Sequence, residues 1–157
     1  MMSPNQTRAA ALALMTSVAM AAEGLRRTAY FDPPGILTVC WGSTTDVQRD
    51  KVYSIEECRS RLDADMNAAM DIVEMCVPGL PPKPLAAFSD AVFNMGGKIV
   101  CNLSESTAAR LLAAGEIEAA CRELPKWNKA KILGVMTPLP GLSKRRRAEM
   151  TLCLDLV

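Results

Sequence analysis

A long helical pattern that ends in a run of prolines sets the first limit on how this chain can fold. Ser54 and Glu57 have the spacing of a capping box, which opens a helix. Six apolar side chains then recur at helical spacing: Cys58, Leu62, Met66, Ala69, Met70 and Val73. The segment VPGLPPKP, residues 77–84, has four prolines in eight residues, and proline disrupts helix interiors. The pattern therefore predicts one amphipathic helix that stops near Cys76, followed by a sharp break.

Helices are predicted on both sides of this break. An alanine-rich segment, uncharged from Ala9 to Ala22, predicts a first helix over about residues 7–22 that Gly24 is placed to end. Four further helices are predicted after the prolines, over residues 85–95, 104–114 with Ser104 as cap, 116–124, and from about Leu142 onward. Residues 126–142 are expected to form a Pro/Gly-rich loop that contains Trp127.

Residues 28–44 have a different character, which predicts short strands. TAYF and ILTVCW are rich in β-branched and aromatic residues, and the DPPG between them is a strong turn signal. The length of 157 residues, without repeats or low-complexity linkers, predicts a single domain over residues 1–157. The predicted fold class is α+β and mostly helical, with a small β-hairpin region near the N-terminus and a helical lobe after it.

The chain contains no histidine, which removes Ser-His-Asp and Cys-His catalysis and most zinc sites. Its six cysteines include no C-x-x-C pair, so neither a metal nor another cofactor is expected. An even number of cysteines could form three disulfides in an oxidising compartment such as the periplasm, and sequence alone allows fifteen connectivities. Six buried, reduced cysteines are the alternative.

The net charge is only +1, so no overall field points to a nucleic-acid partner. The charge is nevertheless uneven, because residues 122–147 hold eight Lys/Arg against one acidic residue, a local charge of +7. Such a basic face suits an anionic polymer, and a solvated helix face is the alternative.

Two carboxylates and a hydroxyl flank the predicted hairpin: Glu23, Asp32 and Thr38. Cleavage of a glycosidic bond needs one carboxyl that donates a proton and a second that stays ionised. Glu23 ends an apolar helix, where apolar surroundings would favour a protonated carboxyl, while Asp32 begins a polar turn. In a tight hairpin, Asp32 and Thr38 would lie nearly opposite each other and could bind one water. All three residues also have ordinary structural roles, so spacing alone leaves catalysis open.

The whole stretch EGLRRTAYFDPPGILTVCWGST, residues 23–44, resembles the active-site signature of phage lysozymes (endolysins) of glycoside hydrolase family 24. That signature has Glu, eight residues, Asp, five residues and Thr, followed by a strand and Gly. Four later stretches resemble the family in order and spacing: SIEECRSRLDADM, LAAFSDAVFNMGG, LSESTAARLLAAGEIEAAC and LPGLSKRRRAEMTLC. The resemblance covers about residues 20–155 and implies a lysozyme-like, two-lobed fold.

The resemblance also implies an enzyme that hydrolyses the β-1,4 bond between N-acetylmuramic acid and N-acetylglucosamine in bacterial peptidoglycan. Glu23 would be the general acid, and Asp32 and Thr38 would position the attacking water. Asn94 would contact the substrate, with a helix C-cap as its alternative role. Trp127 would be a core anchor or, alternatively, a platform for a sugar. The expected protein is a monomer that acts in the periplasm of the infected bacterium.

Two other functions are kept as alternatives. A lytic transglycosylase would use the same Glu23, but that reaction needs no pair such as Asp32 and Thr38 to position a water. A module that binds peptidoglycan without cutting it belongs to another class, and the three filled catalytic positions argue against it.

Three further expectations come from the resemblance. The cysteines are expected to pair as Cys40–Cys58, Cys76–Cys101 and Cys121–Cys153. Ser43 stands where many members have histidine, which predicts a change in local stability, and the stretch LPKWNKAKILGVMTPLPG is expected to alter the lower cleft wall. Residues 9–22 resemble a shortened signal-arrest-release segment, which holds some endolysins in the inner membrane before release. A transient membrane tether and a plain first helix therefore both stay open.

Overall fold

A computed structural model describes residues 1–155 of the chain and contains two small sheets among helices. The helices are α1 (Pro4–Glu23), α2 (Ile55–Cys76), α3 (Pro82–Met95), α4 (Lys98–Cys101), α5 (Thr107–Ala113), α6 (Ile117–Cys121) and α7 (Pro140–Leu154), with a 3-10 turn at Leu124–Lys126. The strands are β1 (Arg26–Phe31), β2 (Leu37–Cys40), β3 (Lys129–Ile132) and β4 (Val135–Pro138). This confirms the predicted α+β, mostly helical fold class.

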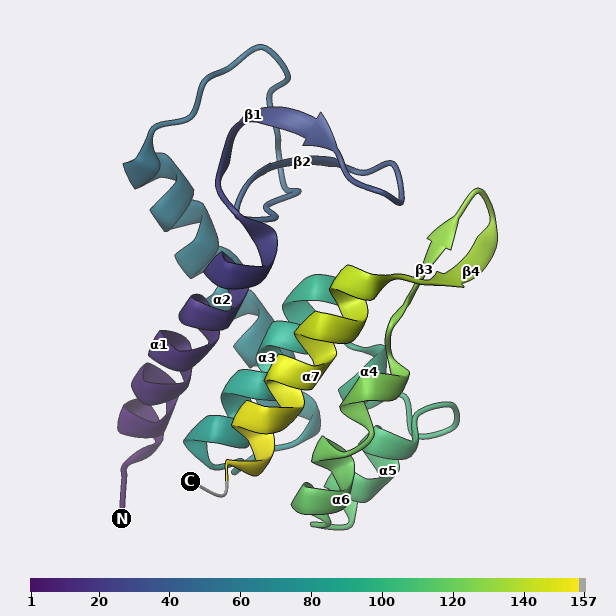
Figure 1. The fold of residues 1–157 in the computed structure, drawn as a ribbon. Helices are drawn as coiled ribbons and strands as arrows, with labels where there is room; N and C mark the ends of the chain where they lie inside the picture. Colours follow the sequence, from purple (N-terminus) through teal and green to yellow (C-terminus); the bar gives the residue numbers. More distant parts are fainter. Residues whose placement is uncertain (156–157) are drawn as a thin grey trace.

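Helix α3 is the centre of the hydrophobic core. It packs against α1, α2 and α7, and every residue from Pro84 to Val92 is buried (Figure 1). A helix that is covered on all sides must be apolar all round, which its sequence LAAFSDAVF nearly is. The buried Ser89 and Asp90 are the polar exceptions, and the partners of Asp90 are described below.

Helix α1 is docked along this core through small and flexible apolar side chains. Ala11, Met15 and Ala19 are four residues apart and are fully buried. Near the N-terminus of the helix, Arg8 donates hydrogen bonds to Asp71 (2.8 Å) and Glu74 (3.1 Å) of α2. Within residues 1–155, no helix is both long enough and apolar enough to span a bilayer.

The hairpin β1–β2 begins directly after α1 and forms the top of the molecule in Figure 1. Its strands pair antiparallel, with Tyr30 opposite Thr38 and Phe31 opposite Leu37. The turn closes when the carboxylate of Asp32 accepts a hydrogen bond from the backbone N–H of Ile36 at 2.7 Å. Such a side-chain to backbone bond is the usual way in which aspartate initiates a turn.

Residues 126–142 do not form the loop that the sequence predicts. Strands β3 and β4 pair antiparallel from Lys129↔Pro138 to Ile132↔Val135. The two-residue turn is Leu133-Gly134, with φ of +49° and +82°, the left-handed pair that matches the twist of a hairpin. Pro138 lies at the end of its strand, where its missing N–H interrupts no ladder of hydrogen bonds. The prolines of this segment therefore do not exclude a hairpin. Pro140 opens α7 two residues earlier than predicted.

Two other helix boundaries also differ from the prediction. Ser106, not Ser104, caps α5 by accepting a hydrogen bond from the N–H of Ala109 at 3.1 Å. Ser104 instead hydrogen-bonds Asn102 within a turn. The segment 116–124 divides into α6 and the start of the 3-10 turn. Trp127 is half-buried against the core, as expected for an anchor.

Three disulfides staple the helices and the first hairpin together, in the pairing that was expected. Cys40–Cys58 joins β2 to α2, Cys76–Cys101 joins α2 to α4, and Cys121–Cys153 joins α6 to α7. No free cysteine occurs in the part of the chain that the structure describes.

Candidate active site

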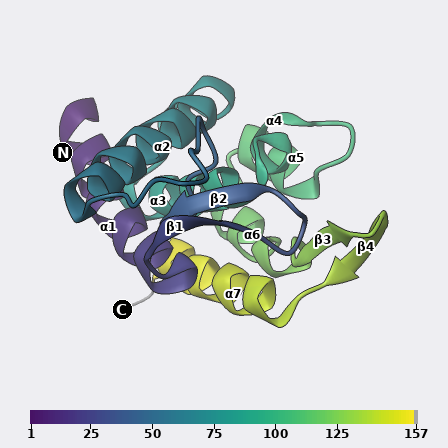
Figure 2. The same cartoon turned by 90° about the horizontal axis from the view of Figure 1, so that it is seen from above.

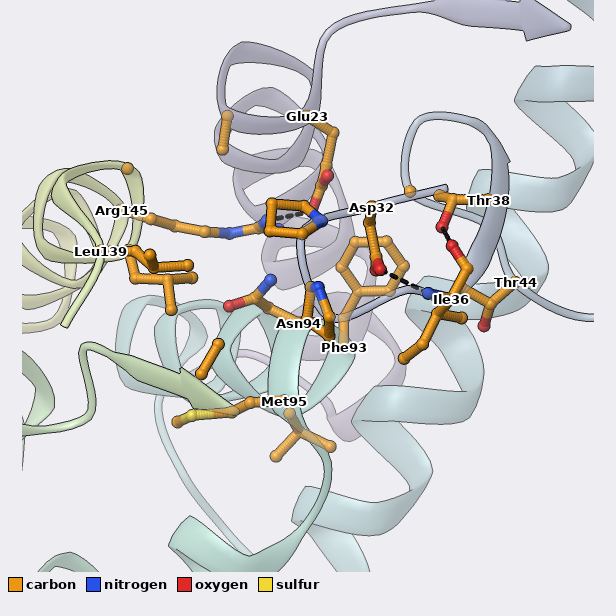
Figure 3. A pocket seen from close by; sticks show the side chains of 18 of the residues that line it. Glu23, Asp32, Ile36, Thr38, Thr44, Phe93, Asn94, Met95, Leu139 and Arg145 are labelled. Atoms are coloured by element: carbon orange, nitrogen blue, oxygen red, sulfur yellow. Dashed lines mark hydrogen bonds and ion pairs between the residues drawn. The ribbon is translucent and has the colours of Figure 1, made fainter. Parts of the chain in front are cut away.

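The three predicted catalytic residues line one cleft. It has a volume of about 840 Å³ and lies between the β1–β2 hairpin on one side and α3, α7 and the β3–β4 hairpin on the other. Glu23, Asp32 and Thr38 face it from the end of α1, the turn and strand β2, while Asn94 faces them from α3 (Figure 3). Residues from four separate elements thus converge. Glu23, Asp32 and Thr38 are also close in the sequence, whereas Asn94 is brought to the cleft only by the fold.

Glu23 is held at the bottom of the cleft by a close approach to backbone. Its side chain is 20% exposed. A Cβ atom on Gly42 would lie only 2.8 Å from the carboxyl carbon of Glu23, so that position accepts glycine alone without movement. Gly42 also has φ of +76°, which glycine adopts most easily.

The surroundings of Glu23 are not the apolar ones that the sequence predicts. Nη1 of Arg145 donates a short hydrogen bond to its Oε1, and the two groups form an ion pair. Arg145 comes from α7, 122 residues further along the chain. Arg145 lies in the run KRRR, which predicts a basic surface exposed to solvent or to an anionic polymer.

The structure overturns that interpretation for two of the four basic residues in the run. Arg145 is 5% exposed and Arg146 is fully buried, so the basic surface is smaller than the local charge of +7 suggests. Buried guanidinium groups need acceptors for their N–H groups, and acidic residues of α3 and α7 supply them. Asp90 pairs with Arg145, and Glu149 pairs with Arg146 at 2.6 Å.

Asp90 holds Arg145 in a two-pronged pair. Nε and Nη2 of Arg145 each donate to one oxygen of Asp90, both at 2.9 Å. Burial alone would lower the pKa of Arg145, but the hydrogen bonds and charge of Asp90, with those of Glu23, raise it above its ordinary value. Burial alone would raise the pKa of Asp90, yet hydrogen bonds from Glu149 and Arg145 lower it. A fixed cation therefore stands beside Glu23.

Glu149 completes this buried cluster. Burial raises its pKa to about 10, and the hydrogen bond to Asp90 acts in the same direction. The positive charges of Arg146 and Arg145 act against this rise in pKa, and the carboxyl groups of Glu149 and Asp90 are placed to share one proton. The sequence signal that could have revealed this cluster is Asp90, an acidic residue within an otherwise apolar helix. A buried charge needs a partner of opposite charge.

Asp32 and Thr38 lie on the same side of the first hairpin but are not directly opposite, since Thr38 pairs with Tyr30. One oxygen of Asp32, Oδ1, is occupied by the N–H of Ile36. The hydroxyl of Thr38 donates to the backbone carbonyl of Ile36 at 2.8 Å, and the side chain is 3% exposed. Both side chains are thus fixed by the turn itself (Figure 3).

Asn94 lies near the end of α3 and lines the cleft. Its Oδ1 accepts a hydrogen bond from Nη2 of Arg146 at 2.9 Å. The C-cap of α3 is Gly96, so the alternative role of Asn94 as a cap is wrong. The carboxamide NH₂ group has no protein acceptor among residues 1–155.

A further acidic residue of the cleft, Asp65 on α2, was missed by sequence reading. Its Oδ2 is buried and has no hydrogen-bond partner within the described residues. Burial raises the pKa of Asp65, while a hydrogen bond with Ser43 and the charge of Arg61 act against this. Ser43 is 2% exposed and accepts a hydrogen bond from Arg61 at 3.1 Å.

The fold of two lobes around a carboxylate-lined cleft is that of a lysozyme. A family model described as Phage lysozyme matches residues 20–149, and the chain belongs to this family. It is accordingly a peptidoglycan-lytic glycoside hydrolase, a muramidase.

Similar proteins agree with this assignment. The chain is 35% identical over 132 residues to an endolysin of Acyrthosiphon pisum secondary endosymbiont phage 1, covering 83% of this chain and 88% of that one. It is 33% identical over 150 residues to a SAR-endolysin of Pseudomonas phage phiKMV, covering 94% and 91%. Among solved structures, the endolysin from Escherichia coli O157:H7 phage FAHEc1 matches with a TM-score of 0.77 and 25% identity, covering 91% and 92%.

Proposed function

We propose that this muramidase hydrolyses the β-1,4 bond between N-acetylmuramic acid and N-acetylglucosamine, with Glu23 as general acid and Asp32 and Thr38 positioning the water. The observation that carries the proposal is the arrangement of hydrogen bonds at these three side chains. Each side chain makes one hydrogen bond within the protein and keeps at least one free lone pair or oxygen atom for a ligand in the cleft.

Glu23 would donate its proton from Oε2. Its other oxygen, Oε1, accepts a hydrogen bond from Arg145 and so is not available to carry the proton. Arg145 therefore selects which oxygen is protonated and fixes the plane of the carboxyl group. The proton passes to the glycosidic oxygen as the bond to the sugar breaks.

Asp32 and Thr38 would each accept a hydrogen bond from one water, and Asp32 would take the proton that the water loses as its oxygen bonds to the anomeric carbon. Oδ1 of Asp32 is occupied by the Ile36 N–H, which leaves Oδ2 as acceptor. The proton of the Thr38 hydroxyl is donated to the Ile36 carbonyl, which leaves the lone pairs of Oγ1. A water held by two acceptors presents its own lone pair to the anomeric carbon. Asn94 would contribute its free NH₂ group to a substrate carbonyl or hydroxyl.

The setting that we propose for this reaction is the periplasm, which suits both the three disulfides and the SAR-endolysin name of relatives. Transient association with the inner membrane through residues 9–22 and action as a monomer are part of the same proposal. Membrane fractionation of the untagged protein before lysis tests the tether, and only soluble protein would reject it.

Mass spectrometry of fragments released from purified peptidoglycan, with wild type beside Glu23→Gln, tests the reaction. Reducing-end muramic acid from the wild type alone is the expected result. Anhydro-muramic ends would instead identify a lytic transglycosylase, in which Asp32 has no water to position. If neither protein releases fragments but both sediment with the wall, the cleft binds without cutting.

A further inference from the structure

Two lysines of the β3–β4 hairpin share one face of their strand. Lys129 and Lys131 are two residues apart, so their side chains lie on the same side of the ribbon. Met136 is paired directly with Lys131 and therefore lies on that side too. All three residues line the cleft that contains Glu23 and Asp32. Ala130 between the two lysines lines the cleft as well, so this edge of the cleft carries two cations and apolar side chains.

The hairpin holds this face in a defined position. At its base, the N–H of Leu139 donates to the carbonyl of Asn128 at 3.0 Å, and the Asn128 carboxamide donates to the Ser143 hydroxyl of α7 at 3.0 Å. At its tip, Leu133 is fully exposed. Figure 2 shows the ribbon standing away from the helical lobe beyond α7. The lysines are therefore carried on a paired ribbon with a fixed base, next to the cleft.

The two lysines lack a counterion within residues 1–155. Both are exposed, and neither takes part in an ion pair with the described residues, whereas the nearby Lys126 pairs with Glu123 at 2.8 Å. The acidic group at the bottom of the cleft, Glu23, is already paired with Arg145. Two adjacent cations beside a substrate cleft are best complemented by negative charge on the substrate itself.

We propose that Lys129 and Lys131 form a subsite for the free carboxylates of the stem peptides attached to the muramic acid residues. This proposal rests on the function proposed above. In peptide-bearing glycan the lactyl carboxyl of muramic acid is held in the amide bond to the peptide, so the free carboxylates along the strand on either side of the cut belong to the stem peptides. Met136 adds an apolar contact suited to the alanine methyl groups of the same peptides. The hairpin thereby makes the enzyme prefer peptide-bearing glycan over bare glycan.

The test compares three soluble substrates of the same chain length. The first is peptide-bearing glycan. The second is the same glycan after an amidase has removed the peptides and the lactyl carboxyls thereby freed on muramic acid have been converted to amides. The third has its peptide carboxyls converted to amides. The enzymes are wild type, the double variant Lys129→Gln/Lys131→Gln, and the control Lys144→Gln/Arg147→Gln. The control also removes two positive charges, from exposed positions of α7 that do not line the cleft. Release of reducing ends gives kcat and KM for each.

On peptide-bearing glycan, we expect the hairpin variant to raise KM about 3- to 10-fold with little change in kcat, the size expected for two exposed charge pairs. Its KM should equal that of the wild type on bare and on amidated glycan, and added salt should reduce the difference on the charged substrate. The control should match the wild type throughout.

Two different results would overturn different claims. An equal loss on charged, bare and amidated glycan would mean that the lysines do not read peptide carboxylates, although the muramidase assignment would stand. If the wild type released no reducing ends from any of the three substrates, the proposed hydrolysis itself would be wrong. Equal melting temperatures of the two double variants would show that neither result reflects unfolding.

Discussion

Asp90 and Arg145 form a buried, two-pronged ion pair between the central helix α3 and the last helix α7, with both N–O distances at 2.9 Å. The same guanidinium contacts Glu23, so the position of the proposed general acid depends on a pair whose members are 55 residues apart in the sequence. A buried carboxylate thus orients the proposed general acid.

Replacing Asp90 with asparagine should therefore reduce both stability and activity. The variant replaces the charged partner of Arg145 on α3 with a neutral amide and leaves Glu23 as the nearest anionic contact of the guanidinium. Removing one member of a buried pair costs about 3–5 kcal/mol of unfolding free energy. We expect kcat to fall by about one to two orders of magnitude, because Arg145 no longer fixes the carboxyl plane of Glu23.

The control for this change is Asp71→Asn, which breaks the exposed pair with Arg8. Such surface pairs contribute only about 0–1 kcal/mol, so stability and kcat should hardly change. The split between kcat and KM, measured well below the melting temperature, separates a positioning role from a purely structural one. In the Asp90 variant kcat should fall while KM stays nearly unchanged, and a normal kcat would show that Arg145 needs no such support.

Glycine 42 offers a second test of how Glu23 is placed. Gly42→Ala would put a methyl group 2.8 Å from the carboxyl carbon of Glu23 and would strain a residue with φ of +76°. The matched control is Gly35→Ala, because Gly35 has φ of +88° but no atom near its added Cβ.

Both variants should lose about 1 kcal/mol of stability or somewhat more from backbone strain, as measured by urea unfolding. Only Gly42→Ala should also lose most of its muramidase activity, since it displaces the carboxyl. Equal activity in the two variants would contradict the close approach.

The buried Glu149 should make stability depend on pH. Its pKa is raised by burial first and by Asp90 second, to about 10. At pH values between the ordinary glutamate pKa and this raised value, Glu149 holds a proton in the folded protein but not in the unfolded chain. The sign follows from linkage: the contribution is fully present below that ordinary value and is lost as the pH rises toward 10.

Glu149→Gln removes this titration and keeps a hydrogen-bond donor. Between about pH 6 and 9, the wild type should lose up to about 1.4 kcal/mol of unfolding free energy per pH unit through this group. The variant should show a much flatter curve, measured by chemical unfolding at each pH. Glu118→Gln is the exposed control and should follow the wild type. Parallel curves for wild type and Glu149→Gln would mean that the carboxyl is ionised in the fold.

The disulfide between Cys40 and Cys58 ties the active-site strand to α2, 18 residues away in sequence. A double variant, Cys40→Ala/Cys58→Ala, should lose about 3 kcal/mol, the size expected for a loop of this length. Activity should fall more than in Cys76→Ala/Cys101→Ala, which opens a bridge between α2 and α4 outside the cleft. Melting curves and muramidase rates of both variants check this, and equal losses of activity would deny the first bridge a role in placing β2.

Some elements of this fold follow from short-range chemistry and were predictable. The capping box at Ser54 and the proline run set both ends of α2, and DPPG placed the first hairpin. The catalytic candidates Glu23, Asp32 and Thr38 could be named because they flank that hairpin in a recognisable order. Their roles were not derivable from spacing, since each residue type is also common at helix ends and turns.

Other features could not be predicted because they depend on residues far away in the sequence or on signals too weak to interpret. The β3–β4 hairpin contains a proline and an unusual Leu-Gly turn, and its strands are too short to show a clear alternation. Arg145 and Arg146 looked solvated because Asp90 and Asn94, which each contact one of them, lie on another helix. Glu149, the local partner of Arg146, is three residues away at the spacing of an ordinary surface pair, so its burial could not be predicted.

The sequence by itself determined the helices, the first hairpin and which residues could do acid–base chemistry, because capping, apolar periodicity and turn formation act within a few residues. The tertiary structure alone decided which cation meets Glu23, which basic residues are buried and that a second hairpin lines the cleft. These depend on side chains brought together across more than fifty positions, where the cost of burying a charge selects partners that no local pattern identifies.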